Sequence, residues 1–207
     1  MTALLSSTYF GPVQWYQKLN RYDEVLIEHC DNYQKQTYRN RCLIATTNGV
    51  QALTVPVSIE ERGERREERY IKISDHGNWR HQHWQAIISA YGDSPFFQYY
   101  EDDLRPFFTQ RWAYLYDFNE AIRQKMCELI DICPKVNFTT DYLVPSTSHL
   151  SELSDFREAI NPKHPQADLD FISRPYYQVY QGKHGFLPNL SILDLLCNMG
   201  PESIYFL

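Results

Sequence analysis

The segment from Tyr33 to Arg41 carries the residue types best suited to binding a charged ligand. Within nine residues it holds three cations, two phenols and Asn40. Lys35 offers a point charge and Arg39 or Arg41 a planar fork, a combination that suits a phosphate or a carboxylate. Asn40 adds a neutral donor and acceptor that can orient a ligand. The alternative is that the arginines pair with nearby acids and that Tyr33 is a packing residue.

A second group of candidates lies between Trp79 and Trp84, where His81 and His83 stand between two indoles. Two residues that are two positions apart on a helix point roughly 200° away from each other. The pair therefore does not chelate one metal ion, but either imidazole titrates near neutral pH and can act as a general base. A capping or packing role is the other interpretation of each histidine.

The candidate serine and cysteine nucleophiles have structural explanations. Ser191-x-x-Asp194 before an apolar run is typical of a capping box at the start of a helix. Cys30 follows His29 at the end of a predicted strand, where adjacent side chains point to opposite faces. The five cysteines lack metal-ligand spacing, and the sequence has no Walker loop, GxGxxG, HExxH or GxSxG motif. We predict no metal, no cofactor and free thiols in a reducing, cytoplasmic compartment.

The elements that must position these residues begin with a parallel α/β unit. A strand over Leu4–Ser7, a loop at Tyr9–Pro12, a helix over Val13–Leu19 and a strand over Glu24–Glu28 follow one another. The loops after the two strands then lie at the same sheet edge, which is where open α/β sheets usually bind ligands.

A hairpin and several helices are predicted downstream. Asn48-Gly49 suits a tight turn between strands at Arg41–Thr46 and Gln51–Ser58. The charged stretch Glu60–Arg69 is interpreted as a solvated hairpin tip, with a docking loop as the alternative. Further helices are predicted from His81, from Ser94-Pro95, along an apolar stripe from Leu115 to Cys133, and over Ser191–Asn198. Further strands are predicted at Asn137–Val144 and Tyr176–Tyr180, and loop with weak helix at Ser146–Ala159. The sequence therefore predicts a single α/β domain with a small mixed sheet, a hairpin and flanking helices.

Composition narrows the class of protein. The chain has 207 residues and a net charge of −6, which favours one domain and disfavours nucleic acid as a partner. No apolar run approaches the roughly 20 residues that span a bilayer, and the first residues do not resemble a signal peptide. Aromatic residues make up 15% of the chain, including 16 tyrosines. Because buried hydroxyls need partners, we expect many tyrosines to line a partly polar groove or an interface.

Motifs spread along the chain together resemble one known family. They are Tyr9-Phe10-Gly11-Pro12, Tyr33-x-Lys35-x-x-x-x-Asn40-Arg41, Leu53-Thr54-Val55-Pro56-Val57, Pro95-Phe96-Phe97 and Phe186-Leu187-Pro188-Asn189-Leu190-Ser191. In this order they resemble the WbqC-like family, small bacterial proteins first noticed in O-antigen gene clusters. The resemblance implies one domain over residues 1–207 and a link to surface-glycan, or lipopolysaccharide, synthesis. It also singles out the Tyr9 loop, the segment from Tyr33 to Arg41, and His83, which we predict to meet at one sheet edge.

Three functions compete. The first is an enzyme, a transferase, that acts on a nucleotide-sugar or an activated acyl group. The second is a non-catalytic protein that binds a ligand or partner in an aromatic groove, and the third, RNA binding, is disfavoured by the net charge. A homo-oligomer is compatible with each. The residues assigned to the enzyme are His83 and Tyr33 as catalytic groups, and Tyr9, Lys35, Asn40, Arg41 and His81 as substrate-binding groups. A His83 in a pocket beside Lys35 would favour chemistry, and a His83 buried among apolar residues would favour binding.

Overall fold

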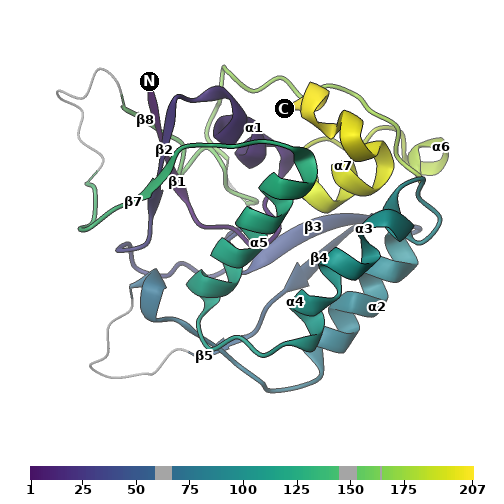
Figure 1. Cartoon of the computed structure of the whole chain (residues 1–207), viewed down its shortest axis with the longest axis horizontal. Coiled ribbons are helices and arrows are strands. Elements are labelled where there is room, and N and C mark those ends of the chain that lie inside the picture. The colour runs from purple at the N-terminus through teal and green to yellow at the C-terminus, as the bar shows by residue number, and fades with distance from the viewer. Residues whose placement is uncertain (59–66, 145–152, 164) are drawn as a thin grey trace.

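A four-stranded parallel sheet forms one side of the molecule (Figure 1). The computed structural model describes residues 1–58, 67–144, 153–163 and 165–207. The strand order is β7-β2-β1-β8, with β1 at Thr2–Ser6, β2 at Glu24–Glu28, β7 at Val136–Phe138 and β8 at Leu153–Asp155. Helix α1, Val13–Arg21, connects β1 to β2, and Leu4 lies opposite Leu26 in the parallel register. The predicted parallel unit is confirmed.

Strand β8 is an element that the sequence did not reveal. We predicted loop and weak helix over Ser146–Ala159, of which residues 146–152 lie outside the described part. The three residues of β8 pair with β1 from Thr2 to Leu4. A strand this short has no measurable alternation of its own, so only its pairing with β1 defines it.

The hairpin is confirmed, but its second strand is shorter than predicted. Strands β3, Arg41–Thr46, and β4, Gly49–Thr54, pair antiparallel around Asn48-Gly49, where Gly49 has a φ of +101°. Only glycine adopts such a value readily. After β4 the chain passes Pro56, which has no N–H to donate to a ladder, and Val57–Ser58 forms β5, paired with β6 at Lys72–Ile73. The described part of the predicted charged stretch includes a 3-10 turn, η1, at Glu68–Tyr70; residues 60–66 lie outside it.

The remaining elements are helical. They are α2 at Trp79–Tyr91, α3 at Phe97–Leu104, α4 at Pro106–Thr109, α5 at Leu115–Ile130, α6 at Gln181–His184, α7 at Ile192–Met199, and a 3-10 segment η2 at Gly200–Phe206. In Figure 1, α2, α3 and α4 lie on the side opposite the parallel sheet. Helix α5 lies between the sheet and these three helices. No helix among the described residues is both long and apolar enough to span a membrane.

Three predictions about helices and strands are corrected. Helix α5 ends at Ile130 because Asp131 takes a left-handed conformation at φ 62°, which leaves Cys133 exposed and buries Ile132 instead. Ser94 does not cap a helix, since its hydroxyl donates to the Tyr91 carbonyl and α3 begins only at Phe97. The predicted strand at residues 176–180 is irregular chain.

The cap at Ser191 is confirmed. Its Oγ accepts a hydrogen bond from the Leu193 backbone N–H at the start of α7. Asp194 serves a different purpose, because its buried carboxylate accepts from the Tyr176 hydroxyl at 2.7 Å and from Gln178 Nε2 at 2.8 Å. This carboxylate therefore attaches the irregular segment around Tyr176 to α7.

Candidate functional site

Three of the predicted ligand-binding residues line one open groove. Lys35, Asn40 and Arg41 meet there with Tyr33, opposite the chain that leaves β4 at residues 54–57, and the groove encloses about 380 Å³. Small-molecule sites commonly fall between about 300 and 1,000 Å³. We call this hollow the cationic groove, and we call the segment from Tyr33 to Arg41 the binding loop.

Among the described residues, the two cations of the groove have no neutralising partner. Arg41 Nε donates to Thr54 Oγ1 at 3.1 Å, and within the described ranges neither Lys35 nor Arg41 has an ion pair. The alternative that the arginines pair with nearby acids is therefore wrong for Arg41 among the described residues. Two uncompensated positive charges beside one hollow attract an anion.

Asn40 and Tyr33 add polar groups to the same groove. Asn40 is only 5% exposed; its Nδ2 donates to the Val55 carbonyl at 2.8 Å, and its Oδ1 has no partner among the described residues. Burial raises the pKa of Tyr33 to about 12, helped by the nearby Glu68 carboxylate. Tyr33 therefore keeps its proton at neutral pH and can donate a hydrogen bond to an anion.

The structure does not bring Tyr9, His81 and His83 to the groove. Tyr9 is fully buried, and its hydroxyl lies 2.9 Å from His83 Nδ1. His83 packs edge-on against Trp79, and burial lowers the pKa of its imidazole to about 4. His81 is exposed on α2. The prediction that Tyr9 and His83 share a pocket with Lys35 is wrong in its geometry, and the roles assigned to these three residues stay predictions.

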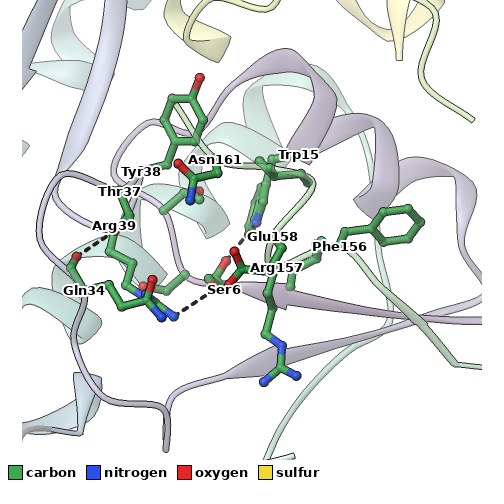
Figure 2. A pocket seen from close by; sticks show the side chains of 14 residues that line it. Ser6, Trp15, Gln34, Thr37, Tyr38, Arg39, Phe156, Arg157, Glu158 and Asn161 are labelled. Carbon is green, nitrogen blue, oxygen red and sulfur yellow. Dashed lines mark hydrogen bonds between the residues drawn. The ribbon is translucent and has the colours of Figure 1, made fainter. Parts of the chain in front are cut away.

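A second hollow lies on the other side of the binding loop (Figure 2). It opens at the carboxyl ends of β1 and β8, between Ser6, the loop at Arg39, and residues 156–161. The chain places β2 and then β7 on one side of β1, and β8 returns on the other side. This is a topological switch point, where open α/β sheets typically bind ligands. We call the hollow the switch-point pocket.

The switch-point pocket is small. Its volume of about 20 Å³ is enough for a group the size of one water molecule. Trp15 is fixed beside it because the indole Nε1 donates to the Ser6 carbonyl at 2.9 Å. In Figure 2 the Arg157 guanidinium and the Phe156 ring point away from the other labelled side chains.

Arg39, unlike Arg41, is fully paired. Its Nε donates to Glu68 Oε2 at 2.7 Å, and its Nη2 donates to Asp31 at 2.6 Å and to Ser6 Oγ at 3.1 Å. Both Arg39 and Glu68 are buried. Burial raises the pKa of the Glu68 carboxyl, and the Arg39 charge opposes that rise. The expected pairing of an arginine with local acids is confirmed for Arg39.

Two further contacts fasten the binding loop to the sheet and to α5. Ser7 donates a short hydrogen bond to Glu68, and Asn119 Nδ2 donates to Ser7 Oγ at 3.0 Å and to the Arg39 carbonyl at 2.8 Å. All of these side chains are buried. The loop is therefore held by a hydrogen-bonded network on the pocket side, while its groove side stays open.

Comparison with known proteins identifies the family. Residues 7–165 match the family described as the WbqC-like protein family. The chain belongs to the WbqC-like protein family. A Mycobacterium tuberculosis protein with the printed name "Uncharacterized protein Rv1507c" is 25% identical to it over 223 residues, which covers 97% of this chain and 94% of that protein. No solved structure matches the chain.

Sequence reasoning missed one polar group of this WbqC-like protein entirely. At the end of β2, the buried Glu28 accepts from the Cys30 N–H, from Thr139 Oγ1 and from the Leu143 N–H. Arg157, which follows β8, lies 3.5 Å from the same carboxylate. Apart from Cys30, these partners lie more than 100 residues from Glu28 along the chain, so spacing gave no signal of them. Among the described residues, no three His, Cys, Asp or Glu side chains are grouped as a metal site.

Proposed function

We propose that this WbqC-like protein binds a small cytoplasmic molecule that carries a phosphate or a carboxylate, and that it does so in the cationic groove. The observation that carries the proposal is a pair of cations, Lys35 and Arg41, that have no ion pair within the described ranges and line one hollow of ligand size. Membership of the WbqC-like family supports a place in surface-glycan or related metabolite synthesis. A nucleotide-sugar or an activated acyl group has the required anion.

Each side chain of the groove suits a part of such a ligand. Arg41 can hold two oxygens of one anionic group, and Lys35 adds a point charge. The protonated Tyr33 hydroxyl donates to a remaining oxygen, and the amide of Asn40 orients the neutral part of the molecule. The half-buried Pro56 and Val57 offer an apolar surface for the body of the ligand.

Binding is the function that the geometry supports best, with group transfer as its extension. A transfer step needs a base, and His83, which we predicted for that role, is neutral at pH 7 but bonded to Tyr9 in the core. Tyr33 reaches the groove but keeps its proton at that pH. The proposal therefore holds as a ligand-binding function even if no transfer activity is found.

Titration of the groove with defined anions tests the proposal. Inorganic pyrophosphate, a nucleotide-sugar and an acyl-thioester are titrated calorimetrically into wild type and Arg41→Ala. Loss of a charge-assisted bond of about 1.5–3 kcal/mol predicts a dissociation constant raised about ten- to a hundredfold.

Arg174→Ala is the matched control, because this exposed arginine also makes one bond to a neutral oxygen, the Tyr205 carbonyl, outside the groove. It should bind each anion as wild type does. Equal dissociation constants for wild type and Arg41→Ala would refute the proposal.

A further inference from the structure

We infer that the cationic groove selects a phosphate monoester over a carboxylate, and that Thr54 is a residue that sets this preference. The inference rests on the proposed function, and it narrows the class of ligand that the groove takes. A phosphate monoester carries close to two negative charges at pH 7 and three terminal oxygens that accept hydrogen bonds. A carboxylate carries one charge and two oxygens, so the two anions make different demands on a site.

The charge of the groove matches a dianion. Lys35 and Arg41 both line it, and neither has an ion pair within the described ranges. None of the described residues that line the groove is an aspartate or a glutamate. A dianion therefore neutralises both cations, whereas a carboxylate leaves one of them uncompensated.

The bond between Arg41 and Thr54 determines which edge of the guanidinium meets the ligand. Arg41 Nε donates to Thr54 Oγ1 at 3.1 Å, and the two Nη groups have no hydrogen-bond partner among the described residues. These two groups form the end of the planar fork, which can hold two oxygens of one anion. A carboxylate has no oxygen left after this contact, but a phosphate monoester has a third.

Hydroxyl groups beside the fork can donate to this third oxygen. Thr54 Oγ1 accepts from Arg41, so the proton of this exposed hydroxyl is left for a ligand. The contact with Arg41 also keeps Thr54 close to any anion that the fork holds. Tyr33 lines the same groove, and its pKa of about 12 means that it keeps its proton at neutral pH. A phosphate uses these donors more completely than a carboxylate does.

The groove also has room for the group that is esterified to the phosphate. It encloses about 380 Å³, and the half-buried Pro56 and Val57 line it together with the polar side chains. The ligand class is therefore a phosphate monoester of a small organic molecule, and not inorganic phosphate alone.

Three probes that derive from glycerol test the preference. Glycerol 3-phosphate carries a dianionic phosphate, its methyl phosphodiester carries a monoanionic one, and glycerate carries a carboxylate. Binding is followed by the assigned backbone N–H resonances of Lys35 and Thr54, well above the second phosphate pKa of about 6 and at constant ionic strength. The dissociation constant of glycerol 3-phosphate should be about tenfold lower than that of glycerate, and that of the diester should fall between them.

The outcomes separate this inference from the proposed function. Equal dissociation constants for glycerol 3-phosphate and glycerate would overturn the preference and leave anion binding in the groove standing. Equal constants for glycerol 3-phosphate and its methyl diester would overturn the monoester assignment. Absence of saturable binding by all three probes would overturn both the inference and the proposed function.

Variants test the role of Thr54. Thr54→Val should weaken glycerol 3-phosphate binding about three- to tenfold and glycerate binding less, because only the phosphate has an oxygen left for the hydroxyl. Thr54→Ser keeps the hydroxyl and should restore the preference. Thr109→Val removes an exposed threonine hydroxyl of α4, outside the groove, and should change neither ligand. Unchanged binding in Thr54→Val, or equal weakening of both ligands, would overturn the role of Thr54.

Discussion

The two hollows beside the binding loop differ in the partners of the arginine that lines each of them. Arg39 is buried, points toward the switch-point pocket side, and is neutralised by Glu68 and Asp31. Arg41, two residues further on, lines the cationic groove and, in the part of the chain that the structure describes, bonds only to the neutral Thr54 hydroxyl. The difference shows that the role of a cation here is decided by its partners rather than by its type. A paired arginine fastens the loop, and an unpaired one is available to a ligand.

The largest expected difference between the two arginines is in stability, which the removal of each one in turn would test. Arg39→Ala leaves Glu68 buried without its counter-charge, so we expect unfolding free energy to fall by about 3–5 kcal/mol. Arg41→Ala removes a half-exposed side chain whose bond is to a neutral hydroxyl. It should change the unfolding free energy by less than about 0.5 kcal/mol. Urea denaturation of both variants measures the contrast. Equal losses would mean that Arg39 is not the fastening residue.

Acid should destabilise the folded protein through His83, which is buried in the core. The pKa of His83 lies at about 4 in the folded protein, below its ordinary value of 6.5. The unfolded chain therefore binds more protons between these values, and stability present above pH 6.5 is lost as the pH falls toward 4. At 1.36 kcal/mol per unit, the loss is on the order of 3 kcal/mol.

The check is unfolding free energy against pH for wild type and His83→Gln. The variant keeps a side chain that can bond to Tyr9 but cannot titrate, so its curve should be flatter between pH 6.5 and 4. Parallel curves for the two proteins would show that His83 is not the titrating group.

A smaller effect on ligand binding would separate the charge of Arg41 from the shape of its guanidinium. Arg41→Lys keeps the charge of the cationic groove but loses the planar fork. We expect pyrophosphate binding to weaken about three- to tenfold, which lies between wild type and Arg41→Ala. Isothermal titration at constant ionic strength measures this, since salt screens the exposed charges. Binding as weak as in Arg41→Ala would show that the fork, and not the charge, holds the anion.

Residues close together in the sequence were the predictable part of the site. Lys35, Asn40 and Arg41 fall within seven residues just past β2, and a short loop can turn them toward one hollow. The separation of Tyr9 and His83 from these residues was not predictable, because each lies on a different element and both are buried in the core. Their aromatic rings gain more from burial against Phe118 and Trp79 than from facing water.

The sequence by itself determined the local elements of this protein. Alternation and apolar runs marked β1 and β2, Asn48-Gly49 marked the hairpin turn, and Ser191 marked the start of α7, since each depends on backbone preferences of neighbouring residues.

Only the tertiary structure decided what depends on partners far along the chain. It placed three-residue β8 beside β1, which created the switch point, and it brought Arg157 to Glu28 across 129 positions. It also paired Arg39 with Asp31 and Glu68, whereas Arg41 has no acidic partner among the described residues. Such pairings are selected by burial and complementary charge in the folded chain, and neither quantity exists until distant segments have met.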